Sequence, residues 1–202
     1  MQKTAYKIEN GILSGSQWCP SPNYNERILA GKGAELSIDD SLQNTQLYST
    51  AIDLLVIHNI SLPPAQFENG YIEAFFQNRL PVNAHSYFTE IADLKVSSHL
   101  LITRSGKVMQ FVNLNDRAWH AGLSCFQGRT NCNDLPYTFQ QYKTLAAVTC
   151  AIQGSYPSII RTSIVGHCDI APERKTDPGD AFNWSYFFQL MRLMNKSYSV
   201  DK

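Results

Sequence analysis

The sequence predicts a single α/β domain in which a mixed central β-sheet is flanked by helices. Its 202 residues have the length of one domain, and 44% of them are hydrophobic, which is enough for a full core. Segments typical of a strand, a helix, a hairpin, a helix, a strand and a helix follow one another in that order. We treat residues 1–202 as one domain with a surface loop at 31–50, where Gly, Ser, Asn, Gln and Asp are frequent.

The first predicted strand is the run Ile52–Ile57, which is apolar almost without alternation. Such a run is typical of a central strand that is buried on both faces. A short helix is predicted over Tyr71–Leu80, directly before a proline. Its expected buried stripe consists of Ile72, Phe75 and Phe76. The next pattern predicts a hairpin that pairs Ser97–Arg104 with Lys107–Val112.

A longer helix is predicted from the N-cap Thr138 to Gly154. Its apolar face contains Tyr142, Leu145, Val148, Thr149 and Ile152. The β-branched run Ser163–Val165 predicts another strand, and Trp184–Met194 predicts a final helix. These elements complete the expected arrangement of strands covered by helices.

The segment Gly166–Gly179, GHCDIAPERKTDPG, concentrates polar groups in a short stretch that contains two prolines. His167 directly follows a predicted strand and is expected at its end, and Asp177 comes ten residues later. Lys175 lies two positions before Asp177, so the two side chains share one side of an extended chain. An imidazole and a carboxylate on a rigid connector are suitable ligands for zinc.

A third ligand would leave one tetrahedral position for water, and His58 fits because it directly follows the run Ile52–Ile57. Each histidine alone is weak evidence, because a single histidine is more often a hydrogen-bonded structural residue. The separation of His58 and His167 in sequence also lies outside any local metal motif. The residues by themselves make zinc the leading hypothesis without establishing it.

Five blocks of sequence, in order from about Ser14 to Phe187, resemble a known enzyme family. They are VIHNISLPP at 56–64, NAHSYF at 83–88, VSSHLLITRSGKVMQFV at 96–112, RAWHAGLSCFQGR at 117–129 and GHCDIAPERKTDPG at 166–179. The family is that of the bacterial zinc-dependent 1,6-anhydro-N-acetylmuramoyl-L-alanine amidases. These are type 2 amidases related to phage T7 lysozyme and to peptidoglycan-recognition proteins, so the resemblance implies a T7 lysozyme-like α/β fold.

The resemblance implies that His58, His167 and Asp177 bind Zn²⁺ and that Lys175 is a catalytic residue that polarises the substrate carbonyl. The implied reaction, in peptidoglycan recycling, is hydrolysis of the amide between the lactyl group of 1,6-anhydro-N-acetylmuramic acid and L-alanine of the stem peptide. The implied partner is therefore a small-molecule anhydro-muropeptide. Zinc lowers the pKa of a bound water to about 7, and a lysine stabilises the developing oxyanion.

The same resemblance supplies candidate substrate contacts, namely Asn59, Lys95, Trp119, His120 and Arg129. Trp119 is equally suited to a plain core position. Lys95 and Asn131 occupy positions where relatives are expected to carry arginines that hold the stem-peptide carboxylates. A lysine keeps the charge but loses bidentate geometry, and Arg129 is placed to compensate for Asn131.

The chain departs from the family pattern after Cys132-Asn133-Asp134. A strand of the form F-S-I-G-I-E-L-E-G is expected there, but Asp134 runs directly into Leu135-Pro136-Tyr137-Thr138, so about a dozen residues are absent. The first glutamate of that strand is the family's proposed general base or acid. No residue of this sequence matches it.

Two explanations compete for this departure. Either the natural protein contains the strand and the sequence in hand omits it, or the chain lacks it. Loss of a central strand removes two ladders of backbone hydrogen bonds from a domain with about 5 to 15 kcal/mol of net stability, which favours omission. An intact mass of 22.8 kDa would contradict omission. If the strand is truly absent, the alternative function is a non-catalytic muropeptide-binding or sensing protein on the same fold.

Composition excludes several other classes. The 17 basic and 17 acidic residues give no electrostatic argument for nucleic acid or a membrane surface, and no apolar run approaches the ~20 residues of a membrane span. Residues 1–10 have no apolar signal core, so a cytoplasmic location is expected. Five cysteines without a CxxC pair argue against a disulfide framework and a thiolate metal site. The sequence does not indicate an oligomeric state, and a monomer is plausible.

Overall fold

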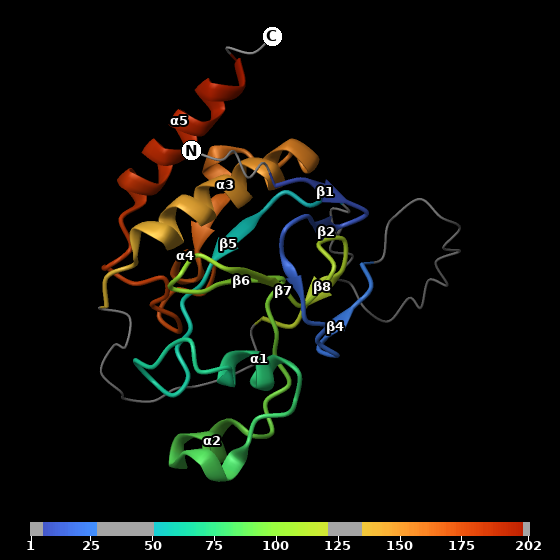
Figure 1. Cartoon of the computed structure of the whole chain (residues 1–202), viewed down its shortest axis with the longest axis vertical. Helices are drawn as coiled ribbons and strands as arrows, with labels where there is room; N and C mark the ends of the chain where they lie inside the picture. The colour runs from blue at the N-terminus through green and yellow to red at the C-terminus, as the bar shows by residue number, and fades with distance from the viewer. Residues whose placement is uncertain (1–5, 28–50, 121–134, 200–202) are drawn as a thin grey trace, which may run out of the picture.

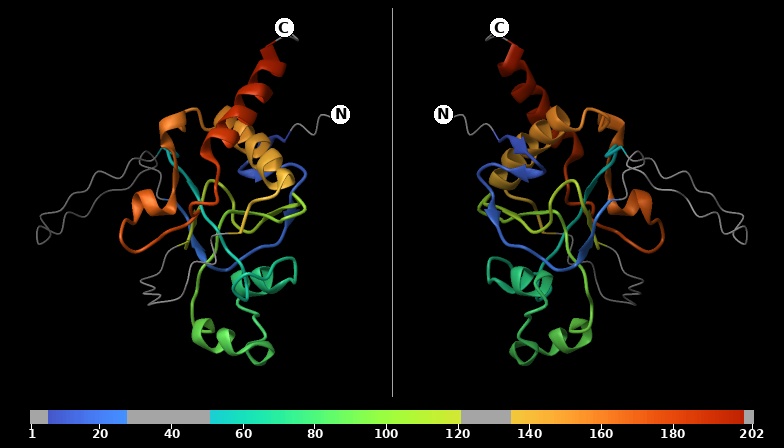
Figure 2. Two further views of the ribbon diagram at one scale, coloured as in Figure 1. Left: turned by 90° about the vertical axis from the view of Figure 1, so that its left-hand side faces the viewer. Right: turned by 90° about the vertical axis from the view of Figure 1, so that its right-hand side faces the viewer.

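The computed structural model describes residues 6–27, 51–120 and 135–199, so the surface loop expected at 31–50 lies outside the described residues. Strands occupy the middle of the molecule, with the long helices α3 and α5 at one end and the short helices α1 and α2 at the other (Figures 1 and 2). This arrangement confirms the predicted α/β class. Among the described residues, no helix combines the length and apolar character that a membrane span needs.

The strands are short and form several separate ladders. They are β1 (Ile8–Glu9), β2 (Ile12–Leu13), β3 (Gln17–Trp18), β4 (Tyr24–Asn25), β5 (Leu55–Ile57), β6 (Leu100–Ile102), β7 (Val108–Gln110), β8 (Arg117–Ala118) and β9 (Ile164–Gly166). In the three-stranded sheet β3-β7-β6, β7 runs parallel to β3 and antiparallel to β6. β5 pairs in parallel with β9 in a second sheet. β1 pairs with β2 and β4 with β8, both antiparallel.

The helices agree with the sequence pattern except at their ends. They are α1 (Tyr71–Phe76), α2 (Ser86–Ile91), α3 (Phe139–Ser155), α4 (His167–Ile170) and α5 (Trp184–Ser199), with 3₁₀ turns η1 (Val82–Ala84) and η3 (Arg161–Ser163). The predicted cap of α3 is confirmed, because Thr138 Oγ1 accepts a hydrogen bond from the Gln141 amide at 3.1 Å. α1 ends before the predicted Leu80, since Asn78 takes a left-handed backbone with φ 57°.

The predicted hairpin is present as β6 and β7, with Leu100 opposite Gln110 and Ile102 opposite Val108. Its turn requires Gly106, whose φ of +86° lies in the left-handed region. A Cβ at this position would also lie 3.2 Å from the backbone oxygen of Gln140 in α3. The hairpin tip therefore approaches the start of α3 more closely than a larger residue allows.

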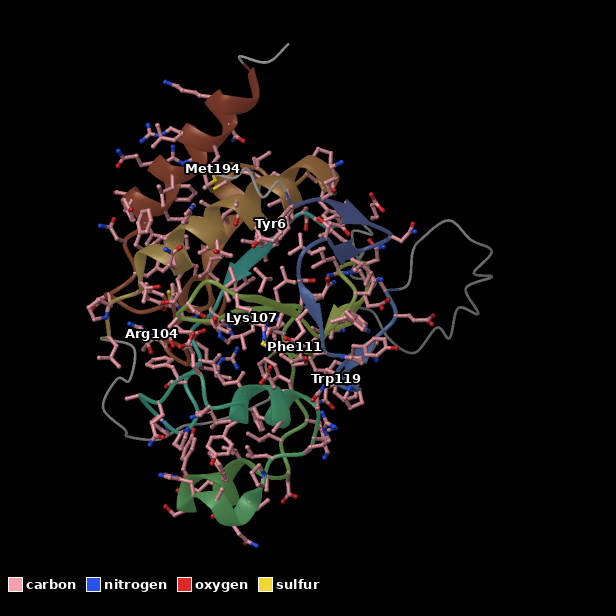
Figure 3. All side chains as sticks on the ribbon, viewed as in Figure 1. Tyr6, Arg104, Lys107, Phe111, Trp119 and Met194 are labelled. Atoms are coloured by element: carbon pink, nitrogen blue, oxygen red, sulfur yellow. The ribbon has the colours of Figure 1, made fainter. Side chains whose placement is uncertain are left out.

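Two hydrophobic cores lie on either side of the strands. The α1–α2 core contains Cys19, Leu62, Ile72, Phe75, Phe76, Phe88, Ile91, Met109, Phe111, Val112 and Ala118. The α3–α5 core contains Leu13, Ile57, Val108, Leu114, Tyr142, Ala146, Val148, Ile152, Ile159, Ile164, Phe182, Phe187 and Met191. Phe111 lies between the strands and α1 (Figure 3). All three residues of the predicted α1 stripe are buried.

The predicted central strand is shorter and less buried than its sequence indicates. Only Leu55–Ile57 form a ladder, because β9 is the partner and spans three residues. Leu55 and Val56 are half-buried, and Leu54 is 45% exposed. The expectation of a strand buried on both faces is therefore wrong for these residues. Among the described residues β5 has β9 as its one neighbouring strand, and full burial needs a second.

Candidate metal centre

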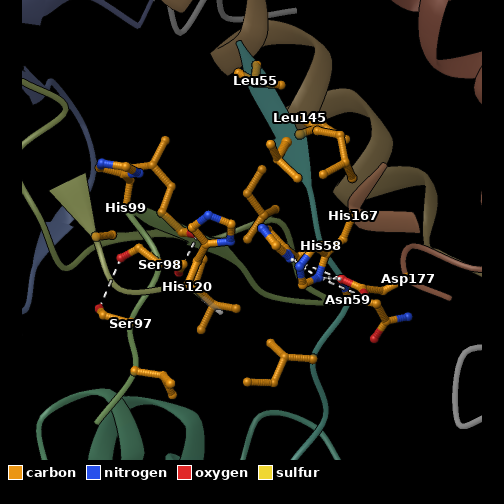
Figure 4. A pocket seen from close by; sticks show the side chains of 18 of the residues that line it. Leu55, His58, Asn59, Ser97, Ser98, His99, His120, Leu145, His167 and Asp177 are labelled. Atoms are coloured by element: carbon orange, nitrogen blue, oxygen red, sulfur yellow. Dashed lines mark hydrogen bonds and ion pairs between the residues drawn. The ribbon is translucent and has the colours of Figure 1, made fainter. Parts of the chain in front are cut away.

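His58, His167 and Asp177 converge where the paired strands β5 and β9 end (Figure 4). Nδ1 of His58 lies 3.1 Å from Nδ1 of His167 and 3.0 Å from Oδ2 of Asp177. Nδ1 of His167 lies 3.1 Å from Oδ1 and 3.2 Å from Oδ2 of the same carboxylate. Three side chains from distant parts of the sequence thus present ring nitrogens and carboxylate oxygens to one point.

The register of β5 against β9 places the two histidines side by side. Ile57 is opposite Gly166 in this parallel ladder, so the next residue on each strand is a histidine. His167 was expected at a strand end, but β9 stops at Gly166 and His167 is the first residue of α4. His167 is almost fully buried, with 4% of its side chain exposed, whereas His58 is 25% exposed. Solvent therefore reaches the pair from the His58 side.

Asp177 is held against this point by its own backbone and by a glycine. The amide of Cys168 donates to the carbonyl of Asp177 at 3.0 Å, and the amide of Asn59 lies 3.4 Å from Oδ2. A Cβ on Gly166 would lie 2.7 Å from Cδ of Pro178, so only glycine permits this approach. The turn that carries Asp177 therefore rests directly on the end of β9.

The donor set fits a divalent cation of the zinc class. Two imidazole nitrogens that face each other at 3.1 Å repel through their lone pairs unless a proton or a cation lies between them. Ligand atoms around a tetrahedral ion with bonds of about 2.0–2.1 Å lie about 3.3 Å apart, close to the distances found here. Imidazole nitrogen with one carboxylate suits zinc and other transition metals better than the all-oxygen preference of magnesium or calcium.

The charge states also favour cation binding. Burial lowers the pKa of His167 below its ordinary value, although Asp177 acts in the opposite direction. Burial alone would raise the pKa of Asp177, but the hydrogen bond from His58 and the charges of the two histidines outweigh it, so the pKa is lowered. A neutral imidazole and an ionised carboxylate are the forms that bind metal ions.

His120 is a second candidate for the third metal ligand beside His58 and His167. Its ring centroid lies 5.0 Å from that of His58 and 5.6 Å from that of His167, and nitrogen atoms of the three histidines lie within 4.8 Å of one another. The residue as a whole is exposed, but burial of its ring, followed by the charges of His58 and His167, lowers its pKa to about 4. Asp177 lies nearer to both histidines than His120 does, and its carboxylate is ionised, so it is the stronger candidate for a third ligand.

Tyr137 joins two segments of the site by hydrogen bonds, and no sequence pattern pointed to it. Its hydroxyl donates to the carbonyl of Pro178 at 2.7 Å and accepts from Nδ2 of Asn59 at 2.8 Å. These bonds join the residue after His58 to the residue after Asp177. Burial raises the pKa of Tyr137, so its hydroxyl stays protonated and remains a donor.

The other sequence-based candidates divide into those near the site and those away from it. Lys175, His120 and Asn59 line the same cavity as the three converging side chains. Lys95 is exposed and is not among the cavity-lining residues, and neither is Trp119. The indole of Trp119 instead donates to Oδ1 of Asn25 in β4, at the edge of the molecule (Figure 3). Arg129 lies outside the described residues.

The cavity at this site is large, about 1040 Å³. One part of its wall contains His58, His167 and Asp177, and other parts contain strands β5 and β6 and the inner face of α3. Leu55 and Leu145 mark its continuation away from the histidines (Figure 4). The site therefore lies at a cavity whose wall contains residues of both hydrophobic cores, with strands β5 and β6 and helix α3 on its α3–α5 side.

An α/β domain that presents two imidazoles and a carboxylate at the ends of parallel strands, beside a large cavity, has the donor set of a metal-dependent hydrolase. Residues 48–180 match the N-acetylmuramoyl-L-alanine amidase family, and the chain belongs to this family of enzymes. The expected family resemblance is thereby confirmed.

Two named relatives are similar to this chain over most of its length, beyond the family match at residues 48–180. The sequence is 43% identical to the 1,6-anhydro-N-acetylmuramyl-L-alanine amidase AmpD of Haemophilus influenzae, over 92% of this chain and 97% of the relative. It is 44% identical to AmpD of Escherichia coli, over 89% of this chain and 94% of that relative. A crystal structure of a selenomethionine AmpD derivative superposes with a TM-score of 0.72 at 42% identity, covering 91% of this chain and 98% of that one. The solution structure of Citrobacter freundii AmpD gives a TM-score of 0.55.

The alignments also indicate a gap in this chain. The alignment with the E. coli relative spans 192 positions, whereas 89% of this 202-residue chain is about 180 residues. About 12 positions of that alignment therefore have no residue here. The Haemophilus alignment leaves about 11, because 92% of 202 residues is about 186 of its 197 positions. These numbers agree in size with the segment that the family pattern places after Asp134.

Proposed function

We propose that this chain is a zinc-dependent amidase that cleaves the bond between the lactyl group of 1,6-anhydro-N-acetylmuramic acid and L-alanine, in cytoplasmic peptidoglycan recycling. The observation that carries the proposal is the convergence of His58, His167 and Asp177 at 3.0–3.2 Å. The names of the relatives with 43% and 44% identity support the substrate class.

In this proposal His58, His167 and Asp177 hold the metal ion. When bound, zinc supplies an acidified water with a pKa of about 7 and polarises the scissile carbonyl. Lys175 is half-buried in the cavity wall two residues before Asp177, and its ammonium stabilises the negative charge that develops on the carbonyl oxygen. Asn59 and His120 line the same cavity and orient the substrate.

The general base that such a reaction needs has no counterpart of the family's glutamate among the described residues. Besides Asp177, the described acidic residues that line the cavity are Asp53 and Glu173, and both are exposed. Neither matches the family's catalytic glutamate. This observation favours a second candidate, in which the chain binds anhydro-muropeptides and does not cleave them.

Product analysis separates the two candidates. The purified chain is incubated with an anhydro-muropeptide, with and without a chelator, and the products are measured by mass spectrometry. Release of the free anhydro-sugar only in the presence of metal supports the amidase. Saturable binding without release supports the second candidate, and neither binding nor release contradicts both.

The third ligand is tested with one substitution at each of the two candidates, Asp177 and His120. Asp177→Ala is expected to weaken zinc binding by at least a hundredfold, because it removes an oxygen and a negative charge. His120→Ala is expected to retain stoichiometric zinc. Titration with a fluorescent zinc chelator measures both. The reverse order of effects would assign the metal to the three histidines instead of to Asp177.

A further inference from the structure

The three converging side chains account for three of the four ligand positions of a tetrahedral ion. His58, His167 and Asp177 supply these three groups. A ring nitrogen of His120 stands close by, because nitrogen atoms of His58, His120 and His167 lie within 4.8 Å of one another. In the close view of the site, His120 lies on one side of the histidine pair and Asp177 on the other (Figure 4). The two residues therefore approach an ion at different positions.

The separations of the imidazole rings are those of ligands that share one ion. With a zinc–nitrogen bond of about 2.1 Å, each ring centre lies about 3.2 Å from the ion, so two tetrahedral ligands have ring centres about 5 Å apart. The centre of the His120 ring lies 5.0 Å from that of His58 and 5.6 Å from that of His167. The His58 and His167 centres are closer, at 4.3 Å. A shift of the His120 ring by about 1–2 Å brings its nitrogen from 4.8 Å to the ligand spacing of about 3.3 Å.

The His120 side chain can make this shift while its backbone stays in place. Its amide donates to the carbonyl of Ala118 at 3.0 Å. Within the described residues its ring nitrogens make no hydrogen bond, whereas Nε2 of the nearby His99 is bonded to the carbonyl of Asp116 at 3.0 Å. His120 therefore keeps a nitrogen lone pair available for a metal ion, and no side-chain bond has to break first.

Exposure distinguishes the three imidazoles by how readily each exchanges with another ligand. The His167 side chain is 4% exposed and that of His58 is 25% exposed, whereas His120 belongs to the exposed residues. A ligand at the surface is within reach of water and of an entering substrate, and a buried ligand is shielded from both. His120 is therefore the imidazole that an entering group displaces first.

We propose that His120 is a fourth, displaceable ligand that closes the metal centre of the resting protein. The proposal rests on the proposed function, which places an ion between His58, His167 and Asp177. Four protein ligands make the closed pattern of a structural site, and three make the open pattern of a catalytic site. His120 leaves with its own lone pair, and an oxygen atom of water or substrate donates another in exchange. Hydrolysis therefore begins with the release of His120.

The first experiment counts the imidazole ligands without turnover. X-ray absorption spectroscopy of the zinc-loaded full chain is expected to show three imidazoles, and His120→Ala is expected to show two. His85→Ala is the control, because His85 caps α2, accepts from the Tyr87 amide at 3.1 Å and is absent from the cavity wall. This variant should retain three. Two imidazoles in the unaltered chain would overturn the proposal.

The second experiment tests displacement with azide as a probe for an open position. Azide is expected to bind the Co²⁺-loaded His120→Ala variant at least about tenfold more tightly than the unaltered chain, because no ring has to leave. The visible absorption of Co²⁺ measures both affinities. Saturating azide should also lower the imidazole count of the unaltered zinc form from three to two. Equal azide affinities, or three imidazoles that persist under azide, would overturn the proposal.

Zinc stoichiometry separates a failure of this proposal from a failure of the proposed function. If the unaltered chain binds one zinc ion through two imidazoles, His120 is not a ligand but the proposed metal centre stands. If the chain binds no zinc, both proposals are overturned.

Discussion

The two cores of this domain are built from similar residues but packed to different extents. In the α1–α2 core, Phe88 and Phe111 are 0% and 1% exposed, and the adjacent strand β7 is bonded on both edges. On the α3–α5 side, β5 and β6 stand beside a cavity of about 1040 Å³ with half-buried leucines. Apolar composition alone therefore does not complete a core. A strand reaches full burial where it has neighbours on both edges and cover on both faces.

The comparison predicts its largest effect for matched truncations in the two regions. Phe111→Ala is expected to lower the free energy of unfolding by about 3–5 kcal/mol, because it opens a cavity in a closed core. Leu100→Ala, on the α3–α5 side, should cost about 1 kcal/mol or less, since Leu100 already borders open space. Urea denaturation measures both changes. Equal losses would mean that the two cores are packed alike.

Removal of the metal is expected to lower stability mainly in strands β5 and β9, on the loosely packed α3–α5 side. With zinc bound as proposed, a hundredfold excess over its Kd is expected to add about 2.7 kcal/mol to the free energy of unfolding, and a chelator to remove this contribution. Because His58 and His167 follow β5 and β9, amide exchange should accelerate in these two strands and stay constant in β7. Uniform acceleration across all strands would show that the two regions unfold as one unit.

A smaller effect is expected from the Tyr137 hydroxyl, which joins two segments of the candidate metal centre. Tyr137→Phe removes the hydrogen bonds to Pro178 and Asn59, and zinc affinity should fall about tenfold, or about 1.4 kcal/mol. Tyr142→Phe is the control, because its hydroxyl accepts from the Asn183 amide in the same aromatic cluster but contacts neither residue. Competition with a metal chelator gives both affinities. A similar loss of zinc affinity in both variants would show that Tyr137 contributes only by packing.

The smallest expected effect concerns the Thr149 hydroxyl, which is buried and has no hydrogen-bond partner in the described part of the chain. Thr149→Val keeps the shape of the side chain and removes its buried oxygen, so stability should rise by about 0.5–1 kcal/mol. Thr144→Val removes a hydroxyl that donates to the carbonyl of Gly106 at 3.0 Å, and stability should fall by about 1 kcal/mol. Thermal unfolding compares the two. A destabilised Thr149→Val would show that the cavity already supplies this oxygen with a partner.

The sequence predicted the elements that have strong periodicity or clear end signals. The α1 stripe, the cap at Thr138 and the hairpin turn at Gly106 depend on local rules, and all are present. The two-residue strands near the N-terminus were not predicted, because they are too short to show alternation of apolar and polar residues. Helix α2, with six residues, is too short to show a clear helical period. The half-burial of Leu55 and Val56 was missed because it depends on a neighbour, not on the strand's own residues.

The site was predictable to a similar degree. His58, His167 and Asp177 were proposed from strand ends and from a family pattern, and the structure brings them together. Their role as metal ligands stays a prediction. The closeness of His120 to the pair and the hydroxyl bridge of Tyr137 had no local signal, because both depend on contacts between segments distant in sequence.

The pairing of Ile57 with Gly166 has a consequence for how this domain folds. Sliding β5 along β9 by one residue would turn one imidazole to the opposite face, and sliding by two would offset the rings by about 6.6 Å along the strand direction. Neither alternative can hold one ion with both histidines. A bound metal therefore favours a single alignment of two short strands whose three pairs of residues would otherwise specify it weakly.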